Sequence, residues 1–103
     1  MTLKTDLLAE LQKIDGVEAR HSPELGNIEL LYRERSFAHF HNDNELDLRL
    51  TKRVIKELDM SHPPGSVNHP GRSQNSPWIE VRFNHPDDIK RVSELVRRAV
   101  AVL

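Results

Sequence analysis

The strongest constraint on the fold is a hairpin pattern in residues 36–50, where apolar and polar side chains alternate on both sides of a polar turn. Leucine occupies every second position from 46 to 50, with a charged residue in each gap. This period of two is typical of a strand that buries one face only. The run Asn-Asp-Asn at 42–44 lies between the two halves, and such residues favour tight turns. The segment therefore predicts two antiparallel strands.

The length of the turn sets the register of this hairpin. A two-residue loop would place His41 opposite Leu46, which mixes a polar and a core residue on one face. A three-residue loop keeps the apolar residues together, so we predict that register. The resulting cross-strand pairs are His41 with Glu45, Phe40 with Leu46, His39 with Asp47, and Phe37 with Arg49.

Each face of the predicted hairpin then has its own character. The face toward the helices carries Ala38, Phe40, Leu46, Leu48 and Leu50. The other face carries Phe37, His39, His41, Asp47 and Arg49, and gains Trp78, Glu80 and Arg82 if the last strand joins the same sheet.

The flanking sequence predicts an α+β fold, in which a mostly antiparallel β-sheet has helices packed on one face. We expect one domain over residues 1–103 and the order α-β-β-β-β-α-β-α. The expected elements are a helix at 2–14, strands at 17–21, 27–32, 36–41 and 46–50, a short helix capped by Thr51, a strand at 78–83, and a final helix with Pro86 at its first position. Residues 59–76 have little periodicity, and a covering or partner-binding role and simple mobility both stay open for them.

Composition excludes several classes of function. The chain has 15 Lys and Arg against 16 Asp and Glu, so no net positive charge draws it to nucleic acid. It has no cysteine, which excludes disulfides, zinc ribbons, iron–sulfur sites and thiol nucleophiles. No apolar stretch approaches the roughly 20 residues of a membrane span, and the N-terminus lacks an apolar signal core. We therefore expect a cytoplasmic protein without a membrane or nucleic-acid partner.

Two histidines at alternate strand positions are the main chemical signal on the polar face. His39 and His41 project the same way, about 7 Å apart along the strand. Asp47 lies across the ladder and either orients His39 or completes a two-histidine, one-carboxylate set. Three interpretations stay open at this point: a polar face covered by water, a ligand pocket without metal, and a metal site. The sequence names no cofactor.

Four further residues are candidates for ligand contacts around the histidines. Trp78 offers a planar floor, and Arg49 offers a positive charge on the same face. Phe37 is expected beside them. His62 comes from the long loop at 59–76 and contacts a ligand if that loop covers this face; exposure of His62 to solvent stays open as the alternative. The predicted site therefore has His39, His41 and Asp47 as catalytic residues, with Phe37, Arg49, His62 and Trp78 around the ligand.

From Arg35 onward the chain resembles the luciferase-domain family, which includes fungal luciferases and many small uncharacterised proteins. A more distant likeness, of architecture only, is to YjbR-like domains. The residues that carry the family resemblance are Arg35-x-x-Ala38-His39-x-His41, Asp43 in the turn, the alternating leucines at 46–50, His62-Pro63, Trp78, and the helix after Pro86.

Fungal luciferases oxidise a hydroxylated pyrone with molecular oxygen, so the resemblance implies that His39 and His41 bind a ligand or transfer protons. Many members of the family carry a histidine where this chain has Asp47, which turns a set of three histidines into two histidines and a carboxylate. We therefore expect a small-ligand-binding domain, in the form of a cofactor-independent, oxygenase-like enzyme. The alternative is a non-enzymatic module that docks a protein partner or a second copy of the chain.

Overall fold

The computed structural model describes residues 2–61 and 76–103. The order of elements is the predicted one, and the α+β class is confirmed. The elements are α1 (Leu3–Leu11), β1 (Val17–Ser22), β2 (Asn27–Tyr32), β3 (Arg35–Phe40), β4 (Glu45–Arg49), α2 (Lys52–Glu57), β5 (Trp78–Arg82) and α3 (Asp88–Ala101).

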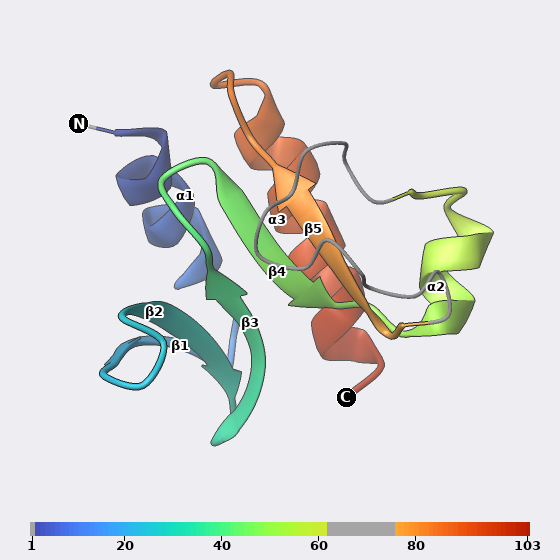
Figure 1. The fold of residues 1–103 in the computed structure, drawn as a ribbon, viewed down its shortest axis with the longest axis horizontal. Helices are drawn as coiled ribbons and strands as arrows, with labels where there is room; N and C mark the ends of the chain where they lie inside the picture. The colour runs from blue at the N-terminus through green and yellow to red at the C-terminus, as the bar shows by residue number, and fades with distance from the viewer. Residues whose placement is uncertain (1, 62–75) are drawn as a thin grey trace.

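The five strands form one antiparallel sheet in the order β1-β2-β3-β4-β5, so each strand pairs with its neighbours in the sequence (Figure 1). The hairpin β3–β4 therefore lies toward the middle of the sheet, with β5 as the edge strand beside β4. Its register is the one that a three-residue turn predicts, because His39 pairs with Asp47 and Phe40 pairs with Leu46.

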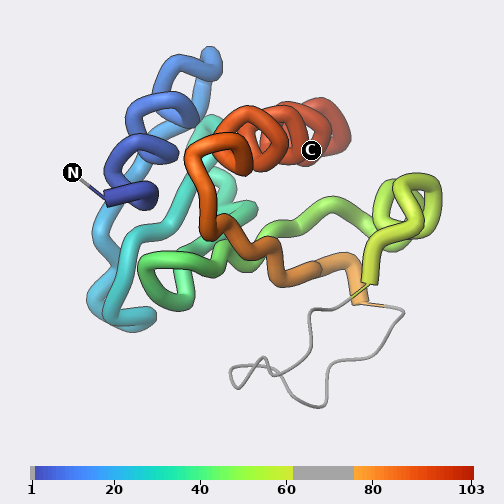
Figure 2. The backbone as a smooth tube through the Cα atoms, turned by 90° about the horizontal axis from the view of Figure 1, so that it is seen from above, coloured from blue at the N-terminus to red at the C-terminus, as the bar shows by residue number. Residues whose placement is uncertain are grey.

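Helices α1 and α3 lie against one another on one side of the sheet (Figure 2). The apolar stripe of each helix meets the apolar side of the strands, which accounts for the single core of the described residues. The five sheet residues expected to face the helices are all buried. The fully or almost fully buried core includes Leu7, Leu11, Leu30, Ala38, Phe40, Leu46, Leu48, Leu50, Ile79, Val92, Val96 and Ala99.

Both long helices are shorter than expected at one end. Helix α1 has the expected cap, since the Thr2 side chain accepts from the backbone N–H of Thr5. It ends at Leu11 and not at residue 14, because the N–H groups of Lys13 and Ile14 reach back three residues instead of four. Helix α3 begins at Asp88, so the expected first position at Pro86 lies in the preceding turn.

The side chain of Asp88 organises the start of α3. Its Oδ2 accepts hydrogen bonds from the backbone N–H groups of Asn84 (2.9 Å) and His85 (3.1 Å). Because these bonds favour the ionised form, they lower the pKa of this partly exposed carboxyl below its ordinary value. The negative charge also lies at the positive end of the helix dipole.

Strand β3 contains a bulge that the sequence pattern did not predict. Leu30 of β2 pairs with Ala38, but the next residue, Leu31, pairs with Ser36, so Phe37 is the extra residue on β3. Phe37 is fully buried and belongs to the hydrophobic core. The expectation that Phe37 shares the polar face with the histidines is therefore wrong, because strict alternation does not hold across a bulge.

Candidate functional site

The polar side of the sheet is built as rows of side chains that cross three strands. In the first row, His39 of β3 pairs with Asp47 of β4, and Asp47 pairs with Glu80 of β5. Cross-strand partners in an antiparallel sheet project from the same face, so these three side chains are neighbours. In the next row, the backbone N–H of His41 bonds to the carbonyl of Glu45, and Glu45 pairs with Arg82.

The two histidines converge on the Asp47 carboxylate. Its Oδ2 lies 3.4 Å from Nε2 of His39 and 3.6 Å from Nε2 of His41. One donor atom from each of the three side chains lies within 4.8 Å of the other two. The imidazole rings stand edge to face with centroids 5.2 Å apart. The structure thus brings together the three residues that the sequence proposed as catalytic, which we call the His39–His41–Asp47 cluster.

A second carboxylate holds His41 in place. Nδ1 of His41 lies 2.6 Å from Oε2 of Glu45, and Nε of Arg82 donates to Oε1 of Glu45 at 3.0 Å. Burial by itself raises the pKa of the Glu45 carboxyl, but the hydrogen bonds and positive charge of His41 and Arg82 outweigh burial and leave that pKa below its ordinary value.

The ionised Glu45 fixes the tautomer of His41. A carboxylate only accepts hydrogen bonds, so Nδ1 of His41 must be the donor. When His41 is neutral, its Nε2 therefore carries the lone pair, and this is the atom that faces Asp47. The sequence predicted Glu45 opposite His41 but gave Glu45 no role. The predicted register was itself the feature that could have indicated this contact.

Burial distinguishes this face from an ordinary water-covered sheet surface. Glu45, Asp47 and Glu80 are only 4%, 1% and 3% exposed. The side chain of His41 is likewise buried, whereas that of His39 keeps 19% of its surface exposed. Charged groups are seldom buried without a structural or functional cause, so the interpretation of a merely solvated polar face does not hold at its centre.

The remaining candidates for ligand contact divide into three cases. Trp78 lies beside the cluster, with its ring 5.7 Å from that of His39 and tilted by 50°. Arg49 pairs with Trp78 across β4 and β5, so it extends the same face by one row. Phe37 is in the core, as described above, and His62 lies outside the described residues.

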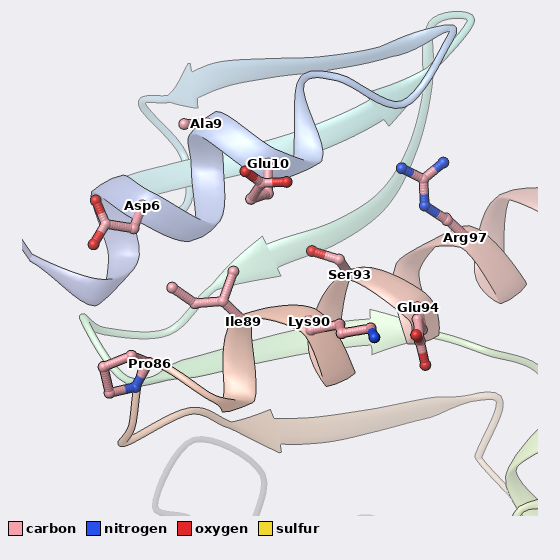
Figure 3. A pocket seen from close by; sticks show the side chains of 9 residues that line it. All are labelled: Asp6, Ala9, Glu10, Pro86, Ile89, Lys90, Ser93, Glu94 and Arg97. Carbon is pink, nitrogen blue, oxygen red and sulfur yellow. The ribbon is translucent and has the colours of Figure 1, made fainter.

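A groove of about 590 Å³ lies on the helix side of the molecule, between α1 and α3 (Figure 3). Most of its lining side chains are exposed and carry mixed charges, including Glu10, Lys90, Glu94 and Arg97. Within the described part of the chain, Ser93 has a buried hydroxyl with no hydrogen-bond partner, and this residue lies on the α1 side of α3. The groove therefore has volume, but no converging set of like donor atoms.

Fold and site together define an α+β domain that carries a histidine–carboxylate cluster on the polar face of its sheet, which is the face opposite α1 and α3. A model of the luciferase domain matches residues 34–99, which is more than half of the chain. The chain therefore belongs to the luciferase-domain family, as the Ala38-His39-x-His41 hairpin indicated. No curated protein and no solved structure matches it. Across residues 2–61 and 76–103, no helix is long and apolar enough to cross a membrane.

Proposed function

We propose that this luciferase-domain protein is a small-ligand-binding, enzyme-like domain whose site is the His39–His41–Asp47 cluster. The convergence of two imidazoles on one buried carboxylate is the observation that supports this proposal most directly. Buried titratable groups that share a site are typical of catalytic centres. Membership of a family that includes luciferases favours oxygenase-like chemistry.

The ligand that suits this face is small, planar and hydroxylated. The ring of Trp78 offers a surface for stacking, and its centroid lies 5.7 Å from that of the His39 imidazole, which supports a ligand ring bound close to both. A hydroxyl on that ring can donate its proton to the His39–His41–Asp47 cluster, because imidazoles and carboxylates are the usual general bases of enzymes. Arg49, one row away, can balance the negative charge left on the ligand oxygen.

Trp78 also supplies the readout for a binding test, because it is the only tryptophan in the chain. The probe is 4-hydroxy-6-methyl-2-pyrone, a small hydroxylated ring, titrated into tag-free protein in the presence of EDTA. We expect saturable quenching of Trp78 fluorescence, with at least a tenfold weaker affinity in His39→Ala and in Asp47→Asn. His85→Ala is the matched control, since His85 is exposed and lies outside the sheet.

Equal affinity in the wild type, His39→Ala and Asp47→Asn would overturn the proposed site. Saturable binding that is lost only in His85→Ala would do the same. The competing hypothesis is a module that docks a protein or a second copy of the chain, with Phe37 or Trp78 as the aromatic anchor. Phe37 lies in the core, so Trp78 is the anchor that remains for this alternative. Light scattering of the wild type gives the oligomeric state that this alternative requires.

A further inference from the structure

We infer that His39, His41 and Asp47 bind one divalent transition-metal ion through two imidazole nitrogens and one carboxylate oxygen. The inference deepens the proposed function and rests on the same three side chains, but it concerns the ion and not the organic ligand. Two histidines and one carboxylate form a donor set that suits iron, cobalt, nickel or zinc. The set contains one carboxylate only, so it is a poor match for calcium or magnesium, which prefer oxygen ligands.

The spacing of the donor atoms is the first argument. A tetrahedral ion with bonds of about 2.0–2.2 Å holds its ligand atoms about 3.3–3.6 Å apart. Oδ2 of Asp47 lies 3.4 Å from Nε2 of His39 and 3.6 Å from Nε2 of His41, so both nitrogen–oxygen separations fit that geometry, and one donor atom from each of the three side chains lies within 4.8 Å of the other two. A direct charge-assisted hydrogen bond between nitrogen and oxygen is shorter, at about 2.7–2.9 Å. The two nitrogen–oxygen separations therefore suit a cation held between the groups better than a proton shared by either pair.

The support of His41 is the second, independent argument. Histidines that bind metals almost always donate their other ring N–H to a carboxylate or a carbonyl, which fixes the tautomer and the ring orientation. Nδ1 of His41 makes such a bond to Glu45 at 2.6 Å, and Glu45 is held in turn by Arg82 at 3.0 Å. The lone pair of Nε2 consequently faces Asp47, where the ion would lie.

The three side chains differ in burial, so the inferred site is enclosed at Asp47 and His41 and accessible at His39. Asp47 and His41 have side-chain exposures of 1% and 4%, and both belong to the central hairpin. His39 is 19% exposed and gives the more open approach, beside Trp78. Three protein ligands leave at least one coordination position for water or a ligand oxygen.

The test uses metal alone, added to tag-free protein that has been treated with a chelator and desalted. Cobalt(II) is titrated while its visible absorption is recorded, and zinc(II) binding is measured by calorimetry. We expect one ion per chain, cobalt absorption typical of low coordination number, and affinity that rises from manganese through cobalt to nickel. His39→Ala, His41→Ala and Asp47→Asn each lose at least 100-fold in affinity.

Two further variants separate the site from its support and from unspecific histidine binding. Glu45→Gln retains one-to-one binding but weakens it about 10- to 100-fold, because it removes the carboxylate that orients His41. His85→Ala leaves the affinity unchanged. Thermal unfolding with and without zinc checks folding: the ion raises the melting temperature of the wild type, but not that of His39→Ala, the variant at the most exposed of the three positions.

The absence of stoichiometric binding to the wild type would overturn the inference, as would one-to-one binding that survives in His39→Ala and Asp47→Asn. The pyrone titration in EDTA is independent of this result. Pyrone binding without metal binding overturns the metal site and leaves the proposed function supported. Metal binding without pyrone binding supports the metal site and counts against the ligand class.

Discussion

The polar face of the sheet and the groove between α1 and α3 differ in how their charged side chains are held. On the polar face of the sheet, Asp47 and Glu45 are buried and each has a defined partner across the hairpin. In the groove, Glu10 and Glu94 are exposed, on helix surfaces that water reaches. The groove offers volume for a ligand, whereas the polar face of the sheet offers buried imidazoles and carboxylates that can bind one.

This difference shows that volume and function need not coincide in a small α+β domain. Neighbouring strands place side chains in fixed rows about 5 Å apart, so opposed residues can be locked together by a few contacts. Two helices that meet at an angle leave a hollow between their exposed faces without any such ordering. The four predictions that follow test this difference, from the largest expected effect to the smallest.

The first prediction concerns Phe37, which sequence alternation places on the polar face of the sheet and the structure places in the core. Phe37→Ala is expected to lower the free energy of unfolding by about 3–5 kcal/mol, because it leaves a cavity in a close-packed interior. Urea denaturation followed by circular dichroism measures the loss. Ser36→Ala, at the exposed neighbouring position, is the matched control and should change stability by less than about 0.5 kcal/mol.

The prediction is contradicted if Phe37→Ala loses pyrone binding while its stability stays unchanged. That result would mean that Phe37 lies on the polar face and that β3 has no bulge at this position.

The second prediction compares one glutamate from each region. Glu45→Gln keeps the size of the side chain but removes the charge that His41 and Arg82 share, so it should cost about 1–3 kcal/mol of stability. Glu94→Gln, in the groove, should stay within about 0.5 kcal/mol of the wild type. Both values come from urea denaturation at pH 7. Equal effects of the two substitutions would remove the distinction drawn between the regions.

The third prediction uses the buried hydroxyl beside the groove. Ser93→Ala removes an oxygen that has no hydrogen-bond partner within the described residues, and it leaves the backbone of α3 unchanged. We expect stability to stay the same or to rise by up to about 1 kcal/mol, since a buried polar group without a partner costs free energy. Thermal unfolding measures it. A loss above about 1 kcal/mol would show that the hydroxyl has a structural partner.

The smallest expected effect is a pH dependence at Asp88, at the end of the groove where α3 begins. The folded pKa of this carboxyl lies below its ordinary value of 3.8. Its ionised form therefore contributes stability above about pH 4, and this contribution is lost as the pH falls through the lowered folded pKa.

Asp88→Asn should consequently be less stable than the wild type at pH 7, with a difference that shrinks as the pH is lowered toward 2. Denaturation curves over that range measure it, and Asp87→Asn is the neighbouring control. A difference that is constant with pH would mean that the Asp88 charge does not matter.

The sequence predicted the cluster well because its residues come from one regular hairpin. Alternation and a three-residue turn are enough to place His39 opposite Asp47, and the structure has this pair. The bulge at Phe37 was not predictable in the same way, because it depends on how β3 pairs with β2 and not on the pattern of β3 alone.

The ends of the helices and the support of His41 were missed for other physical reasons. Helix α1 stops early because tighter turns replace its last turn, a local choice that hydrophobic spacing does not reveal. Likewise, the register placed Glu45 beside His41, but only atomic positions show that Arg82 holds this carboxylate while His41 donates to it.

The sequential order of the strands also has a consequence for how the molecule assembles. The donor atoms of the cluster all lie within residues 39–47, so they meet once β3 and β4 close around the turn at 42–44. Closing such a short loop costs little chain entropy and is among the fastest steps in folding. Trp78 and Glu80 arrive with β5, after a much longer connection. If the cluster binds an ion as inferred above, an ion present during synthesis would tie the two strands of this hairpin together before the last strand docks, and the hairpin by itself is only marginally stable.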